Sequence, residues 1–594
     1  MSNLNLLTID TFLGVNKSDT ETLLKPGEAS YMSNWMITDD LKLKKMFGYE
    51  QLFNGLAKKI NGMWYGLIQG IPHLVFTCGG LVYEHNLTTH ENINIGTIAD
   101  AFPTNFFVSN NTLYILDGNE YRQWTGTGNI TTVKGYVPTV FTAAPPTGGG
   151  TILESINYLT GQKSMKFSSD GVSTVYQLPE YNIESVDSVV VNGIEQTKDT
   201  HYTVDLILGT ITFVTKPILG VNNVVPTWTK TNQQDRQSIT KNNYYGGIYY
   251  SRIWLFGNPD HKNTRYPSGI TMSGSSDPTY FPKFSDSNVG EHEITDMCIQ
   301  YNKQLIFTHG DANGASGWYS EQETTTDPYT GIVTTLFPIF PMNSRIGNAA
   351  KGQTRIIMNN PFTVYKGVYQ WVSTYVLNEK NVEWVSKKIQ PDLDEVDLTK
   401  AITFDWDDRG VYILAVDKRV WMYNYRVDAW YALDLPDTPT CFTIVEKDLY
   451  FGTTNGEIMK FNESLGTYNG KPIEAQWEMG FYNFGAEWLR KFIGRMFVAI
   501  KPLAQTHIDL SYETDKSNQS EVYTAKYSLS NFATWNFATF SFATNYSPQP
   551  FKFKIRAKKI DYFKLKITNN GTDSATVLSI TIPSRIGGEV KNRR

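Results

Sequence analysis

The chain contains 594 residues, of which 41% are hydrophobic and 19% are charged, and its net charge at pH 7 is −5. This length exceeds what one ordinary hydrophobic core supports, so we expect roughly two to four folded units. The small negative charge does not favour a protein that reads nucleic-acid sequence, because such proteins carry a basic footprint. The cysteines Cys78, Cys298 and Cys441 are far apart and odd in number, so they show the pattern of neither a disulfide framework nor a zinc cluster.

The start of the chain is predicted to be an ordered arm. It lacks the basic and apolar segments of a signal peptide, and no run approaches the ~18 apolar residues of a membrane span, so we expect a protein made in the cytosol with no membrane partner. Residues 1–55 contain apolar side chains at Leu13, Trp35, Ile37 and Leu43. They predict an N-terminal arm that supplies a strand to the last blade of the repeat that follows, which would remove an exposed edge.

One phrase recurs along two stretches of the chain, residues 56–149 and 233–474. Each copy has short strands with alternating apolar residues, such as Leu113 and Ile115, separated by turn residues such as "SNN", "DGN" and "TNG". Seven candidate copies of about 40 residues predict an all-β fold built on a β-propeller of about six to eight blades. Helical signals are nearly absent.

Two further regions fall outside the repeat. Residues 150–232 follow the Pro- and Gly-rich linker "AAPPTGGG" and predict a small β-domain inserted between blades. Its strands are expected near residues 172–177, 186–191, 201–205 and 210–215. From residue 475 to 594 the phrase stops, and longer alternating strands predict a C-terminal β-sandwich.

A basic strand is the sharpest charge feature of this terminal region. In "FKFKIRAKK" the cations alternate with apolar residues, so a strand would place them on one face. Lysines on a strand face often protect a sheet edge from unwanted pairing. The other interpretation is a contact with an acidic neighbouring subunit or with a nucleic-acid backbone. The candidate contact residues are Lys552, Lys554, Arg556, Lys558, Arg593 and Arg594.

Motifs that carry catalytic chemistry are not found in the sequence. HExxH, P-loop, GxSxG and dinucleotide patterns are absent, and the eight histidines are scattered singly. "DWDDRG" at 405–410 groups three carboxylates, but Asp and Gly are also the residues that a hairpin turn requires. "HGDANGAS" at 309–316 lacks the later ligands of a calcium loop. We therefore expect no enzyme activity, cofactor or metal, although a carboxylate pair for sugar cleavage drawn from distant blades stays open.

The opening segment resembles the start of β-propeller proteins in the tails of double-stranded DNA bacteriophages. There a Gly-Glu-Ala phrase is followed by an asparagine, a basic pair and Gly-Tyr; family members often carry arginine in the pair, where this chain has two lysines. The matching residues are Gly27, Glu28, Ala29, Asn34, Lys44, Lys45, Gly48 and Tyr49. The insert, with "VNG", "YTVD" and "GTITF", resembles β-rich modules of phage fibre and tail proteins. The ending "DYFKLKITNNGTDSATVLSITIP" resembles the terminal sandwich of the same propellers.

The resemblance implies a tail nozzle, or packaged-DNA stabilisation protein, located in the virion. It implies a ring of copies, expected to be a hexamer, around the channel through which the genome leaves. The ring would adjoin other tail or portal-adaptor proteins and touch the passing double-stranded DNA non-specifically. Repeated blades would supply a rigid block with few free edges that tolerates internal DNA pressure. The alternatives are a tail-tip receptor-binding propeller and a polysaccharide-degrading tail enzyme.

Overall fold

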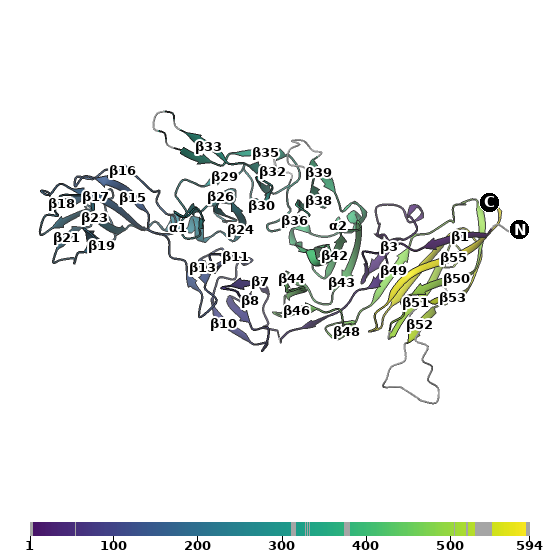
Figure 1. Ribbon diagram of the computed structural model, residues 1–594. Coiled ribbons are helices and arrows are strands. Elements are labelled where there is room, and N and C mark those ends of the chain that lie inside the picture. Colours follow the sequence, from purple (N-terminus) through teal and green to yellow (C-terminus); the bar gives the residue numbers. More distant parts are fainter. Residues whose placement is uncertain are drawn as a thin grey trace. The chain divides into compact units, whose positions relative to one another are not determined.

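The computed structural model describes residues 4–589 except 54, 311–315, 327, 329–330, 332, 373–380, 504, 518–520 and 529–548. Strands dominate this part of the chain, as the sequence predicts, and its α-helices are α1 (Gln233–Thr240) and α2 (Gln390–Leu393) (Figure 1). The chain forms two compact units. The first contains Met1–Tyr65, Leu87–His90 and Ile346–Arg594, and the second contains Gly66–Asn86 and Glu91–Arg345.

A four-stranded antiparallel sheet recurs along the chain and corresponds to the repeated phrase. In the first unit, one copy comprises β36 (Arg355–Ile357), β37 (Asn360–Val364), β38 (Val368–Trp371) and β39 (Val382–Trp384). The next copy comprises β40 (Ile402–Trp406), β41 (Val411–Val416), β42 (Arg419–Asn424) and β43 (Ala429–Asp434). Every residue of β41 is buried, because its sequence "VYILAV" is apolar throughout and neighbours cover both faces.

The second unit contains further copies of the same sheet. One comprises β11 (Asn105–Ser109), β12 (Thr112–Leu116), β13 (Tyr121–Trp124) and β14 (Thr131–Thr132). Another comprises β24 (Tyr244–Tyr249), β25 (Arg252–Phe256), β26 (Thr264–Pro267) and β29 (Ser287–Asn288). A third comprises β30 (Ile294–Gln300), β31 (Lys303–Thr308), β32 (Gly317–Ser320) and β35 (Ile339–Asn343). The chain enters this unit along β7 (Ile60–Ile68), whose sheet continues with β8 (Ile71–Cys78), β9 (Leu81–His85) and β10 (Asn92–Thr97).

Tight turns of one kind join the first two strands of several of these sheets. Backbone φ is positive at both residues of Gln69–Gly70, Asn110–Asn111, Tyr250–Ser251 and Met358–Asn359. Positive φ at both central residues is the geometry of the two-residue type I′ turn, whose twist matches antiparallel strands. The repeated sheet therefore depends on a local feature, since the same turn joins the first two strands of sheets in both units.

The N-terminal arm completes the last repeat sheet. This sheet contains β44 (Pro439–Val445), β45 (Asp448–Thr453) and β46 (Ile458–Phe461), and β6 (Tyr49–Gln51) pairs antiparallel with β46. The short strands β47 (Thr467–Tyr468) and β48 (Lys471–Pro472) extend it. The prediction that the arm supplies a strand to this sheet is confirmed.

Two six-stranded sheets, the terminal sheets, lie elsewhere in the first unit. The β50 sheet comprises β4 (Trp35–Ile37), β5 (Leu43–Lys45), β55 (Thr576–Glu589), β50 (Leu489–Ile500) and β53 (Gln549–Ile560), with β1 (Leu4–Ile9) paired to β55. The β51 sheet comprises β2 (Gly14–Val15), β3 (Glu28–Ser33), β49 (Ala475–Met479), β54 (Phe563–Asn569), β51 (Gln505–Thr514) and β52 (Tyr523–Ser528). Buried residues of both sheets, such as Val498 and Leu565, belong to one hydrophobic core.

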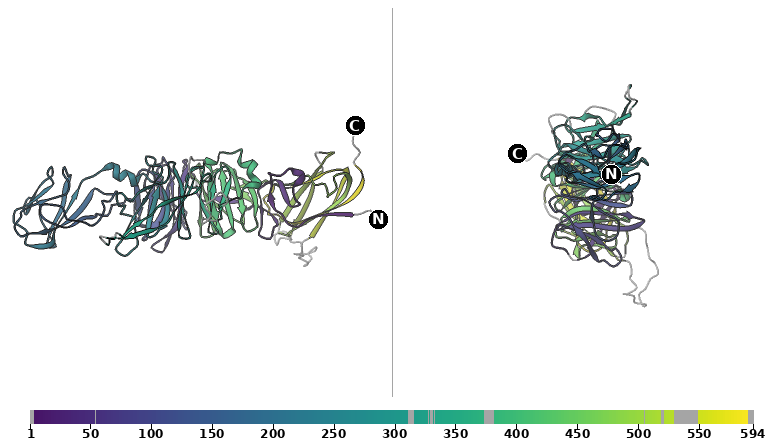
Figure 2. Two further views of the ribbon diagram at one scale, coloured as in Figure 1. Left: turned by 90° about the horizontal axis from the view of Figure 1, so that it is seen from above. Right: turned by 90° about the vertical axis from the view of Figure 1, so that its left-hand side faces the viewer.

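The terminal sheets contain five arm strands in addition to the strands expected after residue 475. Figures 1 and 2 show purple arm strands beside the yellow-green end of the chain. The sequence predicted that the arm supplies a strand to the last repeat, and the structure adds further pairings. Strands β1 and β5 pair with β55, and β3 pairs with β49. Strands β2 and β4 pair within the arm, with β3 and β5. The reason is that alternating apolar residues predict a strand without naming its partner.

The inserted domain begins at Thr139, before the expected boundary at residue 150. Its larger sheet comprises β16 (Thr151–Ile152), β15 (Thr139–Ala144), β17 (Gln162–Ser169), β23 (Gly220–Thr229), β19 (Ser185–Val191) and β20 (Ile194–Glu195). Its smaller sheet comprises β18 (Val175–Gln177), β22 (Thr210–Phe213) and β21 (Tyr202–Asp205). A strand is present near each of the four predicted positions.

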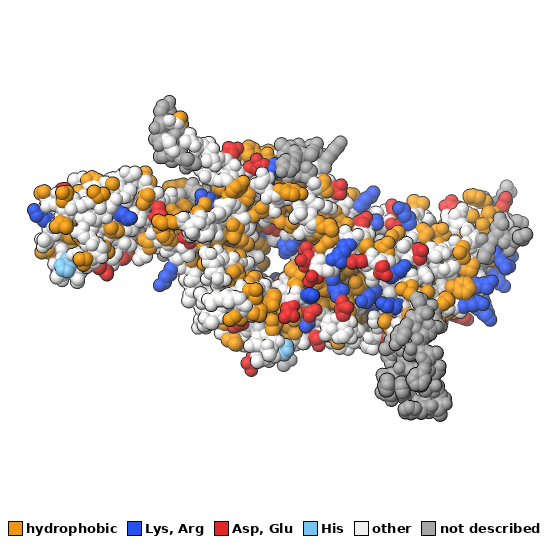
Figure 3. Space-filling view, in the orientation of Figure 1, with side chains coloured by type: hydrophobic (Ala, Val, Ile, Leu, Met, Phe, Trp, Pro, Cys, Tyr) orange, Lys and Arg blue, Asp and Glu red, His pale blue; other side chains and the backbone are white. Residues whose placement is uncertain are grey.

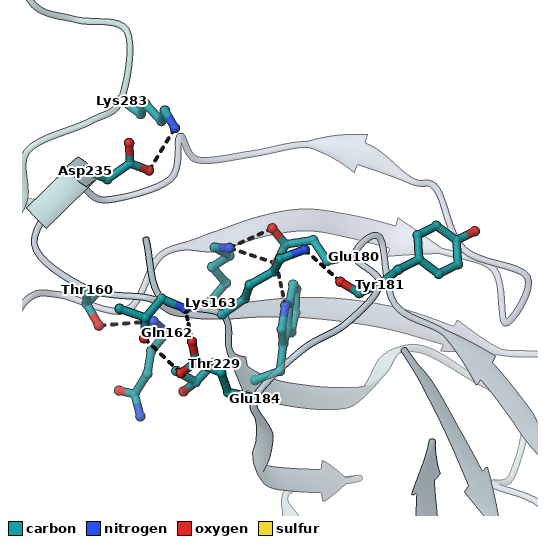
Figure 4. Close-up of polar contacts among 12 residues, drawn as sticks. Thr160, Gln162, Lys163, Glu180, Tyr181, Glu184, Thr229, Asp235 and Lys283 are labelled. Atoms are coloured by element: carbon teal, nitrogen blue, oxygen red, sulfur yellow. Dashed lines mark hydrogen bonds and ion pairs between the residues drawn. The ribbon is translucent and has the colours of Figure 1, made fainter. Parts of the chain in front are cut away.

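A charged contact stabilises the interior of this insert. The Glu180 carboxylate lies 2.7 Å from the ammonium of Lys163, whose side chain is only 7% exposed (Figure 4). The same carboxylate accepts a hydrogen bond of 2.8 Å from the indole N–H of Trp228, which is fully buried. One carboxylate therefore satisfies two buried donors, as buried polar groups require.

Candidate functional site

The residues that carry the resemblance lie in the arm, and the structure places them where the arm meets the rest of the first unit. Gly27 has φ +93°, and a Cβ atom there would lie 2.1 Å from the carbonyl oxygen of Thr11, so only glycine fits. The buried Glu28 carboxylate accepts hydrogen bonds from the Asn16 side chain (3.2 Å) and from the Lys25 backbone N–H (3.1 Å). These contacts fix the chain as it enters β3.

Asn34 forms a hydrogen-bonded junction between β3 and β4. Its backbone has φ +58°, a left-handed conformation that asparagine tolerates better than most residues. Its side-chain amide donates to the carbonyl oxygen of Glu474 (2.8 Å), and its side-chain oxygen accepts from the Asp434 backbone N–H (3.0 Å) and the Tyr468 hydroxyl (3.1 Å). One buried side chain therefore connects the arm to β43, to β47 and to the segment before β49.

The two lysines of the basic pair have different surroundings. Lys45 is 2% exposed, and its ammonium donates to the side-chain oxygen of Asn569 (2.7 Å) and to the carbonyl oxygen of Gly571 (2.6 Å). Burial lowers the pKa of Lys45 to about 8, and the nearby Asp573 carboxylate opposes this shift in part. Lys45 therefore fastens β5 to the C-terminal hairpin, whereas Lys44 lines an open cleft.

Gly48 and Tyr49 fasten the arm to the last repeat sheet. A Cβ atom on Gly48 would lie 1.9 Å from the carbonyl oxygen of Thr467, so the backbones touch at this point. The Tyr49 hydroxyl donates to the carboxylate of Asp437 (2.8 Å), and its ring stacks on Tyr468 with 4.9 Å between the ring centroids. Four of the matching residues therefore hold the arm to distant parts of the first unit, and we name them the arm clamp: Asn34, Lys45, Gly48 and Tyr49.

The cleft beside Lys44 has a volume of about 730 Å³ and carries charges of both signs. Asp39 accepts hydrogen bonds from the Asn424 amide (3.0 Å) and the Arg426 guanidinium (2.9 Å), and the first of these contributes most to lowering its pKa. The pKa of Lys44 is lowered by burial first and then by the cations Arg409 and Lys501. The cleft is lined by Met36, Ile37, Thr38, Asp39, Asp40, Lys44, Asp408, Arg409, Val411, Asn424, Arg426, Tyr431 and Lys447.

The acidic segment 405–410 is the connection between β40 and β41. A short 3-10 turn covers Asp407–Arg409, and Gly410 has φ +66°, so the interpretation as a hairpin turn is confirmed. Burial and then the neighbouring Asp407 raise the pKa of Asp405 to about 6, and its carboxylate accepts a hydrogen bond from the Tyr425 hydroxyl. Within the described part of the chain, no group of three or more His, Cys, Asp or Glu side chains could hold a metal ion.

The predicted basic strand is β53, which lies at the edge of the β50 sheet. Lys552, Lys554, Arg556 and Lys558 are exposed, whereas Ile555 between them is buried, so the predicted division into two faces is confirmed. Figure 3 shows Lys and Arg side chains gathered where β50 and β53 lie. The other candidate contacts, Arg593 and Arg594, lie outside the described residues, as does most of the segment 309–316.

Sequence reasoning missed two cations on the same face. Arg495 on β50 lies directly opposite Lys554, and Arg585 on β55 shares its cross-strand partner, Phe492, with Lys558. Both arginines are exposed. Directly opposite residues point to the same side of a sheet, so the face spans three strands. The six residues of this basic face are Lys552, Lys554, Arg556, Lys558, Arg495 and Arg585.

Comparisons with known proteins give distant structural likenesses. No family model matches the chain, and no curated protein sequence matches it. BamB from Moraxella catarrhalis aligns over 77% of this chain and 100% of its own, with 9% identity and a TM-score of 0.32. The computationally designed Ika8 protein aligns over 69% of this chain and 99% of its own, with 10% identity and a TM-score of 0.31. The extracellular domain of a putative one-component system, BT4673 from B. thetaiotaomicron, aligns over 93% of this chain and 97% of its own, with 9% identity and a TM-score of 0.22.

No helix among the described residues is long and apolar enough to cross a membrane.

Proposed function

We propose that this chain is a structural component of a bacteriophage tail. In this proposal it is a β-propeller of seven blades with an inserted β-domain and a C-terminal β-sandwich. Copies form a ring at the channel through which double-stranded DNA leaves the virion. They retain the packaged genome, guide its ejection and contact adjoining tail or portal-adaptor proteins.

The arm clamp is the observation that carries this proposal. The motif that resembles the phage proteins consists of backbone-contact glycines, a buried asparagine, a buried lysine and a buried tyrosine. Asn34, Lys45, Gly48 and Tyr49 join the N-terminal arm to residues hundreds of positions away, whereas Gly27 closes on Thr11 within the arm. Such residues preserve a rigid connection under load, which a channel component needs and which a substrate-binding loop does not.

The repeated sheets support the propeller within this proposal. In the described part of the chain, seven sheets begin with three consecutive antiparallel strands. The last of these sheets is completed by β6 from the arm. The N-terminal strand β6 pairs with the side of β46 that would otherwise be a free edge, and free edges are sites of unwanted pairing. A propeller closed in this way is a block that can be arrayed around an axis.

Electron cryomicroscopy of phage particles that contain the protein tests this function. We expect a ring of six copies around the tail axis at the DNA exit. Copies at fibre-like positions away from the axis would support the receptor-binding alternative instead. The enzyme alternative is tested by incubating the purified chain with host envelope polysaccharides and measuring reducing ends, whose release would contradict a purely structural role.

A further inference from the structure

The basic face extends beyond the edge strand on which lysines are expected. β53 is an edge strand, so its four cations alone agree with protection against unwanted pairing. Arg495 and Arg585, however, lie on β50 and β55, which have partners on both sides. Cations on interior strands protect no edge, so another explanation is needed for the face as a whole.

The cations of this face have no anionic partner within the described part of the chain. No carboxylate there lies within the 4.0 Å that defines an ion pair with any of the six. Lys554 and Arg495 lie directly opposite one another, an arrangement that like charges disfavour. An external anionic surface would relieve this repulsion.

The composition of the face favours a protein surface over a bare phosphate backbone. Phe492 lies between Lys558 and Arg585, and Phe497 lies opposite Lys552 on the same face. Both rings are partly exposed. Arginine and aromatic side chains together are typical of protein–protein interfaces, where the rings bury apolar area beside the charges.

The rest of the chain carries a net charge of the opposite sign. Residues 475–594 contain 17 Lys and Arg against 9 Asp and Glu, a net charge of +8, so the preceding 474 residues carry −13 of the total of −5. Such an asymmetry attracts the basic end of one copy to the acidic part of another. The two surfaces differ, so the contact is heterologous, and heterologous contacts form rings when the rotation closes.

We propose that the basic face docks on the acidic part, residues 1–474, of a second copy of this chain. This inference rests on the proposed ring and names the contact that builds it. It follows that self-association weakens with salt, because exposed charges are screened. It also follows that a copy in which the charge of the basic face is reversed keeps its acidic part, residues 1–474, and can still accept one neighbour.

Sedimentation velocity of the purified full chain at about 50 mM and about 500 mM NaCl tests the contact. We expect wild-type protein to associate at low salt, and the triple variant Lys552→Glu, Lys554→Glu and Arg556→Glu to associate at least about tenfold more weakly. The matched control reverses the exposed lysines of the second unit, Lys134→Glu, Lys198→Glu and Lys216→Glu. Both triples change the net charge by −6, so only a local contact distinguishes them.

Mixing gives a second readout that a general charge effect would not produce. Adding the basic-face variant to wild-type protein should shorten the assemblies, because the variant accepts a neighbour but cannot continue the chain of contacts.

The proposal is overturned if wild-type protein stays monomeric, if the basic-face variant associates like wild type, or if the control is equally weakened. Loss of duplex-DNA binding in the variant, with self-association unchanged, would assign the face to DNA. Particles with an axial ring but normal occupancy of the variant would refute the contact and leave the proposed function standing.

Discussion

Replacing Asn34 by alanine should loosen the arm from the rest of the first unit. The substitution removes three side-chain hydrogen bonds, to Glu474, Asp434 and Tyr468. Each contributes about 1 kcal/mol net, and more where a buried partner is left unsatisfied. Alanine at φ +58° adds about 1 kcal/mol of backbone strain. The expected loss is therefore about 4 kcal/mol.

Asn34→Gly is the matched control, because it loses the same hydrogen bonds but accepts the backbone conformation. Its expected loss is about 3 kcal/mol. The two units need not unfold together, so amide hydrogen exchange in peptides from β6 and β46 is the appropriate assay. Exchange there should accelerate about a thousandfold for Asn34→Ala and about a hundredfold for Asn34→Gly, since about 1.4 kcal/mol is a factor of ten. Peptides of the second unit should be unaffected. An acceleration below tenfold, or equal effects of both variants, would refute this reasoning.

Three further predictions concern charged residues. Because the pKa of Lys45 falls from 10.5 to about 8 on folding, the unfolded chain binds more protons between these values, and stability should rise with pH there. The stability of wild type relative to Lys45→Met, measured by exchange of β5 amides corrected for intrinsic rates, should therefore gain about 2 kcal/mol between about pH 7 and about pH 9.5; a flat difference would contradict this. Glu180→Ala leaves the buried Lys163 ammonium unpaired and should destabilise the insert by about 3 kcal/mol, whereas an unchanged denaturation midpoint would show that the pair contributes little. Lys554→Glu creates an opposite-charge pair with Arg495 and should stabilise the β50 sheet by up to about 1 kcal/mol in thermal unfolding at low salt, with a loss of stability as the contrary result.

The elements that the sequence predicts correctly have local signatures. The strands of the insert follow from alternation and turn residues, and the division of β53 into two faces follows from the period of a strand. The arm clamp could not be predicted in the same way, because its residues have distant partners: Lys45, for example, donates hydrogen bonds to Asn569 and Gly571 near the other end of the chain. Arg495 and Arg585 could not be assigned to the basic face for the same reason, because only the pairing register of three strands places them beside β53. Motif residues were recognisable by resemblance, but their structural roles depend on distant partners.

The arm strands and the basic face meet at one strand, β55. Its residue Arg585 belongs to the basic face and pairs with Leu4 of β1, while Val577 pairs with Leu43 of β5. β5 carries Lys45, and the chain continues directly into β6, which completes the last repeat sheet. A force applied to the basic face therefore passes through backbone hydrogen bonds into the arm and then into the last repeat sheet. If neighbouring copies dock on this face, the contact at Arg585 connects directly to the arm, because the same strand β55 pairs with β1 and β5.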